Sequence, residues 1–162
     1  MNTRLVSISF AALLLLCSAV SFAGEFEDGV AAYVRGDYKT AFSMFTNAAN
    51  KGDAEAQNML GLMYINGRGV PQDYNQAASW FRKAADQGDA KAQYNLGLMY
   101  YYGHAAPKDY VEALKWITIA AAYSTEKETR DHIARNRDIV ANKMTPAQIA
   151  EAQKRASEWK KK

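Results

Sequence analysis

The stretch DAEAQNMLGLMYINGRGVPQDYNQAASWFRKAADQG, residues 53–88, is followed directly by a second copy, DAKAQYNLGLMYYYGHAAPKDYVEALKWITIAAAYS, residues 89–124. The two copies align without a gap, and both contain the run Leu-Gly-Leu-Met-Tyr and, further on, Asp-Tyr. Self-similarity at a period of this size is typical of solenoids, in which each unit buries its apolar face only against its neighbours. The sequence therefore predicts an all-α fold, a right-handed α-solenoid of stacked helix-turn-helix repeats.

Each copy predicts two helices. In residues 53–88 the first helix runs from Ala54 to Asn66, with Asp53 as N-cap and Gly67 as the left-handed stop. The second runs from about Tyr74 to Gln87, with an apolar stripe at helical spacing. One large residue of this stripe recurs in the next copy and is predicted to lie in the core at both places: Trp80 and Trp116.

Candidate N-caps recur every 36 residues along the chain: Asp37, Asp73, Asp109 and Thr145. Gln76 and Glu112 stand three residues after two of them, which predicts a capping box at each.

A glycine inside each first helix needs a structural reason, because glycine costs a helix up to about 1 kcal/mol relative to alanine. Gly61 and Gly97 are predicted to allow a partner helix to approach closely, with Ala77 and Ala113 as the small residues opposite.

The chain divides into five predicted segments. They are a signal peptide (1–23), a short opening unit (24–52), two repeats (53–88 and 89–124) and C-terminal capping helices (125–162). In the capping segment we expect helices near Glu126–Ala141 and from Pro146 to about Lys160, with Trp159 packing back on the array. The terminal run Lys160–Lys162 is expected to complement the C-terminal end of this last helix.

The first residues predict export. Arg4 precedes an apolar run from Leu5 to Cys17, and Ser21-Phe22-Ala23 has the small-x-small form of a signal-peptidase site. Gly24 is therefore the expected first mature residue, with no stable membrane insertion after cleavage and a periplasmic or secreted location. The alternative is a lipoprotein modified at Cys17, but a leucine stands directly before this cysteine where lipoprotein signals want a small residue.

Charge and cysteine content exclude several kinds of site. The net charge of +3 arises from 20 basic and 17 acidic residues, which is too small and too mixed for a nucleic-acid-binding face. Cys17 is the single cysteine, so its removal with the signal peptide leaves no disulfide or thiolate site.

Three elements together resemble a known family. Ala-Gln-x-x-Leu-Gly-x-x-Tyr, Gly-x-Gly-Val-Pro-x-Asp-Tyr and Ala-x-x-Trp-Phe-x-x-Ala-Ala follow one another between residues 56 and 85. This pattern is similar to the Sel-one-like repeat (SLR), a longer-loop relative of the tetratricopeptide repeat, whereas the opening unit is more tetratricopeptide-like. The second copy departs in its loop, at residues 103–106. The resemblance implies adaptor or scaffold roles with varied partners. A cysteine-rich branch of this family includes penicillin-binding and β-lactamase members, but this chain lacks those cysteines.

No catalytic, cofactor or metal site is predicted. His104 and His132 are 28 residues apart and form no metal-binding motif, so both are interpreted as loop or packing histidines. No Gly-x-Ser-x-Gly element is present, and Ser157, which has Lys160 three residues on, lies on a terminal helix with no orienting group.

A binding surface is predicted on the face of each first helix that points away from the second helix. Tyrosines on this face give a large contact area with few rotatable bonds, and asparagines beside them can hydrogen-bond a peptide backbone. The alternative is that the same residues pack against the next helix and belong to the core. The candidate partner-binding residues are Asn58, Leu62, Asn66, Tyr94, Asn95, Leu98, Tyr101 and Tyr102.

The leading functional hypothesis is an exported, monomeric, non-enzymatic repeat protein that binds a protein or peptide partner through its concave helical surface. Two alternatives remain open: a cell-envelope enzyme of the penicillin-hydrolysing kind, by family analogy alone, and a peptidoglycan- or glycan-binding protein.

Overall fold

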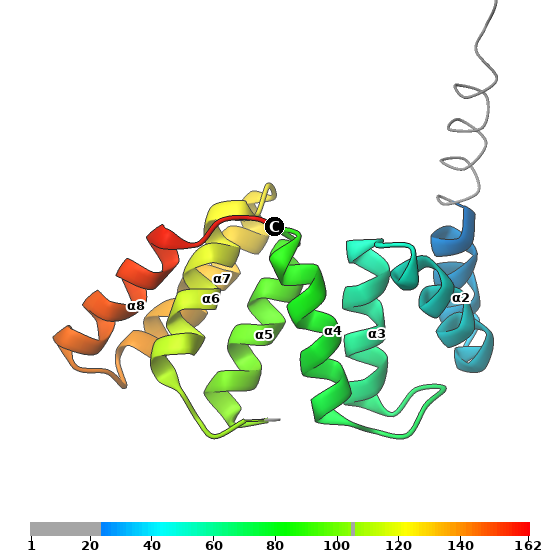
Figure 1. The fold of residues 1–162 in the computed structure, drawn as a ribbon, viewed down its shortest axis with the longest axis horizontal. Helices are drawn as coiled ribbons and strands as arrows, with labels where there is room; N and C mark the ends of the chain where they lie inside the picture. Colours follow the sequence, from blue (N-terminus) through cyan, green and yellow to red (C-terminus); the bar gives the residue numbers. More distant parts are fainter. Residues whose placement is uncertain (1–23, 105) are drawn as a thin grey trace, which may run out of the picture.

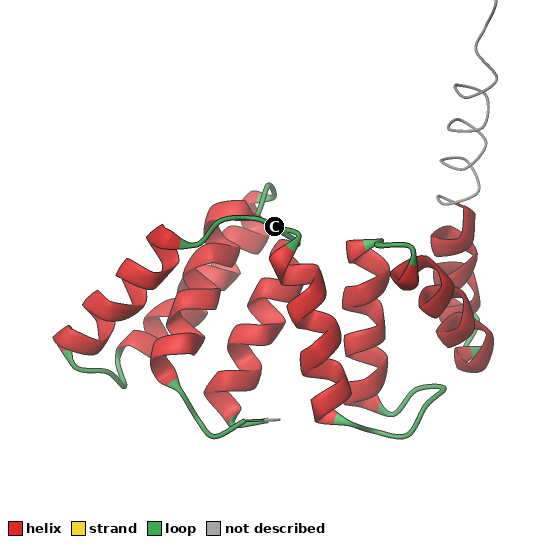
Figure 2. Cartoon of the chain, in the orientation of Figure 1, coloured by secondary structure: helices red, strands yellow, loops and turns green. Residues whose placement is uncertain are grey.

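The computed structural model describes residues 24–104 and 106–162, all of them in helices or in the loops that join helices (Figures 1 and 2). The predicted signal peptide and Cys17 lie outside the described residues. Residues 24–34 are helical. The helices that follow are α2 (Tyr38–Asn50), α3 (Ala54–Asn66), α4 (Tyr74–Asp86), α5 (Ala90–Tyr102), α6 (Tyr110–Tyr123), α7 (Lys127–Ala141) and α8 (Pro146–Glu158). The all-α prediction is confirmed.

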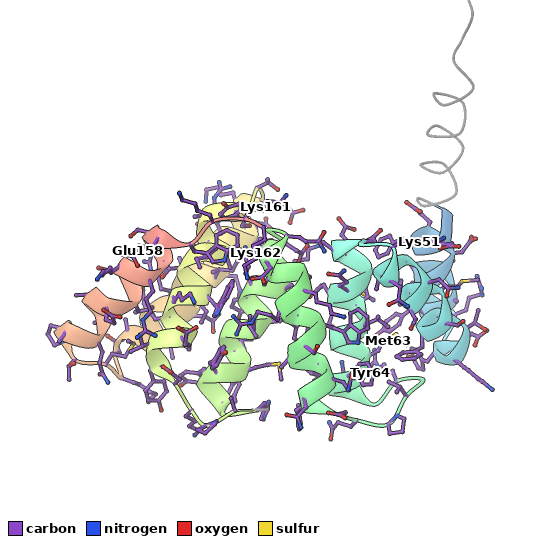
Figure 3. The ribbon with its side chains drawn as sticks, viewed as in Figure 1. Lys51, Met63, Tyr64, Glu158, Lys161 and Lys162 are labelled. Atoms are coloured by element: carbon purple, nitrogen blue, oxygen red, sulfur yellow. The ribbon has the colours of Figure 1, made fainter. Side chains whose placement is uncertain are left out.

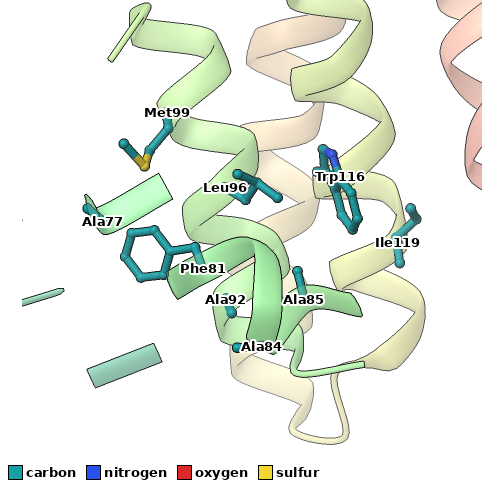
Figure 4. Packing of buried hydrophobic residues seen from close by; sticks show 9 residues of the cluster. All are labelled: Ala77, Phe81, Ala84, Ala85, Ala92, Leu96, Met99, Trp116 and Ile119. Atoms are coloured by element: carbon teal, nitrogen blue, oxygen red, sulfur yellow. The ribbon is translucent and has the colours of Figure 1, made fainter. Parts of the chain in front are cut away.

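Each helix packs mainly on its neighbours in the sequence, as a stacked array requires. Contacts join α2 to α3, α3 to α4, α4 to α5, α5 to α6 and α6 to α7, while α8 turns back onto α6 (Figure 1). The central core cluster combines α4, α5 and α6, and Figure 4 shows nine of its side chains, among them Phe81, Leu96 and Trp116. This cluster therefore joins the repeat of α3 and α4 to the repeat of α5 and α6.

The predicted N-caps are confirmed. The side chains of Asp37, Asp73, Asp109 and Thr145 each accept a hydrogen bond from a backbone N–H in the first turn of the following helix. The capping boxes predicted with Gln76 and Glu112 are wrong, because the structure completes a box only at α8 among the described helices.

Glu112 has other partners. Its carboxylate accepts hydrogen bonds from Lys115 (3.1 Å) and from Arg155 of α8 (3.0 Å), so it ties the last helix to α6. Burial raises the pKa of Glu112, but these two bonds outweigh burial and leave the pKa below its ordinary value.

The close approach predicted at Gly61 and Gly97 is confirmed, with different partners. A Cβ at Gly61 would lie 2.5 Å from the ring of Phe81, and one at Gly97 would lie 2.7 Å from the side chain of Ile117. The facing residues are thus four positions beyond Ala77 and Ala113, although the Ala113 carbonyl also lies 3.1 Å from the Gly97 position. Each glycine leaves room for a large buried side chain, which explains its presence in a helix.

Trp80 and Trp116 are not equivalent, contrary to the prediction. Trp116 is 1% exposed, whereas Trp80 is only partly buried, against the cluster formed by residues 24–34, α2 and α3. Part of the difference comes from Trp159, the residue directly after α8, which lies edge-on to Trp116 with ring centroids 6.1 Å apart, as predicted. Trp80 instead has Lys83 Nζ 4.0 Å above its ring.

The C-terminal tail ends on α4 rather than on its own helix. Lys162 donates from its backbone N–H to the Asp86 carbonyl (2.8 Å), and its Nζ lies 2.8 Å from the Asp86 carboxylate (Figure 3). The prediction that the terminal lysines complement the end of α8 is therefore wrong for Lys162: the cation lies at the C-terminal end of α4.

Candidate functional site

Two adjacent hollows lie along the first helices of successive pairs, and together we call them the groove. The first, of about 280 Å³, is lined from α3, α5 and α7 by Asn58, Leu62, Lys91, Tyr94, Asn95, Thr129, His132 and Ile133. The second, of about 190 Å³, is lined from α3, α5 and the loop after α5 by Ile65, Asn95, Leu98, Met99, Tyr102 and His104. Because Asn95 lines both, the hollows are neighbours along one surface.

A hydrogen bond between two amides joins α3 and α5 in the groove. Asn95 Nδ2 donates to Asn58 Oδ1 at 3.0 Å, and Asn58 is only 5% exposed. No partner from the described residues occupies Asn58 Nδ2 or Asn95 Oδ1, so each amide keeps hydrogen-bonding capacity. An amide held in this way is oriented before a partner arrives.

Aromatic side chains border the groove. Tyr94 is half-buried, and burial raises the pKa of its hydroxyl, with nearby Tyr102 adding to the effect. The Tyr94 ring lies edge-on to His132 of α7, with centroids 5.7 Å apart. Tyr102 is 56% exposed, and its ring stacks with the His104 ring at a centroid distance of 5.8 Å. The His104 ring also stacks with the Tyr74 ring, with centroids 4.3 Å apart. These contacts hold the rings, and more than half of the Tyr102 surface stays open to solvent.

The structure brings six of the eight predicted residues together and separates two. Asn66 is exposed, and its side chain donates to the Leu62 carbonyl of its own helix at 2.7 Å. Tyr101 is half-buried against the cluster of α6 to α8 and lies 5.7 Å from the ring of Tyr110. Neither lines the two hollows of the groove, whereas Asn58, Leu62, Tyr94, Asn95, Leu98 and Tyr102 do.

Sequence reasoning did not identify the contribution of α7. Thr129, His132 and Ile133 close one end of the groove, and His104 lies at the other end. The repeat consensus is lost in α7, so no pattern in the sequence shows which of its faces points to α5. His104 contacts the Tyr74 ring and His132 contacts the Tyr94 ring, which agrees with their interpretation as loop and packing residues.

The chemistry of the groove suits contact rather than catalysis. Lys91 is the one side chain among its lining residues that is charged when histidine is neutral. Within residues 24–104 and 106–162, no three histidine, cysteine or acidic side chains gather in a way that would hold a metal ion. In the same residues no helix is long and apolar enough to cross a membrane.

Comparisons with known proteins agree with this architecture. A model of the Sel1 repeat matches residues 18–53, 54–89 and 90–122. The crystal structure of c5321, a protective antigen of uropathogenic Escherichia coli strains with an SLR fold, matches with a TM-score of 0.78 and 34% identity. A Sel1 repeat protein from Oxalobacter formigenes matches with a TM-score of 0.65 and 29% identity.

These matches cover 85% and 82% of this chain but only 29% of the first protein and 55% of the second. A comparison with curated proteins found no match. Within the matched repeats no catalytic domain is identified. The chain therefore belongs to the Sel1 repeat family, helical repeat proteins that commonly mediate protein interactions.

Proposed function

We propose that this protein is an exported adaptor or scaffold that binds an extended, mainly apolar segment of a partner protein in the groove. The observation that carries the proposal is the Asn58–Asn95 pair between two hollows with apolar walls. An extended peptide presents a backbone N–H and C=O between successive side chains. The free amide groups can satisfy those backbone groups while each hollow accepts one apolar side chain.

The charge of the groove indicates which charges the bound segment should carry. Lys91 stands at one end, and no carboxylate lines either hollow. An apolar segment with an acidic residue near Lys91 would match this surface, whereas a basic segment would lose hydration without gaining an ion pair.

A peptide library displayed on phage and selected against the purified protein tests the proposal. The selected peptides should carry two apolar residues, and their affinity should fall by about 1 to 3 kcal/mol in Asn95→Ala or Leu98→Ala, as truncation of an interface anchor does. Gln76→Ala is the matched control, because Gln76 is exposed on α4, lines neither hollow and should leave binding unchanged.

Three results would overturn the proposal. The first is that no peptide is enriched, and the second is that enriched peptides bind equally well to Asn95→Ala and Leu98→Ala. The third is that muropeptides or other glycans compete for the groove while peptides do not, which would assign the tyrosines to sugar stacking.

The proposed export rests on the sequence at residues 1–23. Intact-mass measurement of the protein recovered from the periplasm or the medium should give a chain that begins at Gly24. A full-length chain in the cytoplasm, or a lipid-modified Cys17, would contradict it.

A further inference from the structure

A separate hollow of about 340 Å³ lies between α4 and the C-terminal half of α5. Polar side chains from α4 line one part of it, namely Asn75, Ser79 and Arg82, and Leu96 and Tyr100 from α5 line another. Met99 and His104 line both this hollow and the second hollow of the groove, so the two spaces are neighbours. Its volume is within the range of small-molecule sites.

The internal repeats explain why a hollow exists at this unit. Ala78 lies on its wall, and the residues at the same repeat position are Phe42 and Leu114. Phe42 packs edge-on against Tyr64, the counterpart of Tyr100, with ring centroids 5.5 Å apart. Leu114 is also buried. Alanine at position 78 therefore leaves open a space that a large side chain occupies at Phe42.

Arg82 is a second departure from the repeat. The residues at its position in the other units are Thr46 and Thr118. The Arg82 guanidinium donates to the Tyr100 hydroxyl at 2.6 Å and lies 4.9 Å from the centroid of the Trp116 ring, so it is held against two aromatic residues.

Arg82 forms no ion pair with the described part of the chain. No carboxylate of those residues comes within 4.0 Å of the guanidinium, although the side chain is half-buried. One N–H group binds Tyr100, and the others have no acceptor among the described residues. A positioned guanidinium with unused donors is suited to a carboxylate, which it can bind in a bidentate manner.

We propose that this hollow, the Arg82 pocket, binds a small carboxylate that carries an apolar group. Arg82 would hold the carboxylate, with Asn75 and Ser79 as further hydrogen-bond donors, and Leu96 and Met99 would contact the apolar group. Two sources share this chemistry: a free organic acid and the C-terminal residue of a peptide. The Arg82 pocket does not depend on the function proposed for the groove.

Nuclear magnetic resonance titration of the purified, nitrogen-15-labelled protein tests the proposal with two matched probe pairs. The first pair is N-acetylphenylalanine and its amide, and the second is a tripeptide ending in phenylalanine with a free or an amidated C-terminus. Both acids should shift the Arg82 Nε–H signal and the backbone amides near Ala78 in a saturable way. The amides should bind about tenfold more weakly or worse, because they lack the charge-assisted bond. Tighter binding of the tripeptide acid would indicate a peptide source, and tighter binding of the free acid would indicate a metabolite.

Two variants copy residues that other units already contain at these positions. Arg82→Thr should weaken binding of the acids about tenfold or more, and Ala78→Phe should abolish it by filling the space. Circular dichroism verifies that each variant folds. Arg35→Thr, which removes the same charge from an exposed residue that does not line the hollow, is the control that should bind the acids as the unmodified protein does. The proposal fails if neither acid gives saturable shifts, if acid and amide bind equally, or if Arg82→Thr retains full affinity.

Discussion

The unequal burial of Trp80 and Trp116 leads to a quantitative prediction. Both residues occupy the same position of the repeat, but Trp116 is 1% exposed while Trp80 is partly exposed. Removal of a fully buried tryptophan costs about 3 to 5 kcal/mol, because apolar contacts are lost and a cavity remains. We therefore expect Trp116→Ala to lower the free energy of unfolding by about 4 to 5 kcal/mol.

Trp80→Ala should cost less. Its ring is partly solvated, and the Lys83 ammonium lies over it, so the flexible Lys83 side chain can move into the vacated space. We expect a loss of about 2 to 3 kcal/mol, so the two variants should differ by at least about 1 kcal/mol. The free energy of unfolding of a domain of this size is about 5 to 15 kcal/mol, so both losses are measurable.

Urea unfolding followed by circular dichroism is the assay. The midpoint of Trp116→Ala should fall clearly below that of Trp80→Ala, with similar slopes for both variants. A double-mutant cycle with Trp159→Ala adds a test of the cause. It should show a coupling of about 0.5 to 1.5 kcal/mol between Trp116 and Trp159 and none between Trp80 and Trp159. Equal midpoints for the two single variants, or no coupling between Trp116 and Trp159, would refute the assignment of this difference to Trp159.

Three further predictions follow from other contacts. Gly61→Ala should lower the free energy of unfolding by about 1 to 3 kcal/mol despite the better helix propensity of alanine, because its Cβ would meet the buried Phe81 ring; an unfolding midpoint equal to or above that of the parent protein would contradict this. The folded-state pKa of Glu112 is lowered, so its carboxylate stabilises the fold above the ordinary glutamate pKa, and this contribution is lost as the pH falls through the lowered value. Glu112→Gln should accordingly be less stable than the parent by about 1 kcal/mol at neutral pH and equally stable in strong acid. Unfolding curves at both pH values test this, and a difference in stability between the two proteins that is the same at both pH values would contradict it. Tyr102→Ala should weaken binding of a groove peptide by about 1 to 3 kcal/mol without changing the melting temperature, whereas Tyr101→Ala should lower the melting temperature. Calorimetry measures both quantities for each variant. A lower melting temperature for Tyr102→Ala, together with weaker peptide binding by Tyr101→Ala, would contradict these roles.

Local chemistry in the sequence was enough to predict the helices. A side chain that caps a first turn and a glycine that ends a last turn act within a few residues, so Asp53 and Gly67 marked the bounds of α3 correctly. The repeat period also predicted which helices would pair, because neighbouring copies must bury the same apolar face. The predicted set of groove residues was based on the same periodicity, which is why most of them share one surface.

The remaining features depended on contacts between residues far apart in the chain. Helical periodicity shows that Trp80 and Trp116 face inward, but whether solvent reaches them depends on what covers them, and at Trp116 both Trp159 and Arg82 lie against the ring. In the same way, repeat position alone does not show that Lys162 returns to Asp86. Sequence periodicity determines the direction in which a side chain points, whereas the tertiary structure determines what lies there.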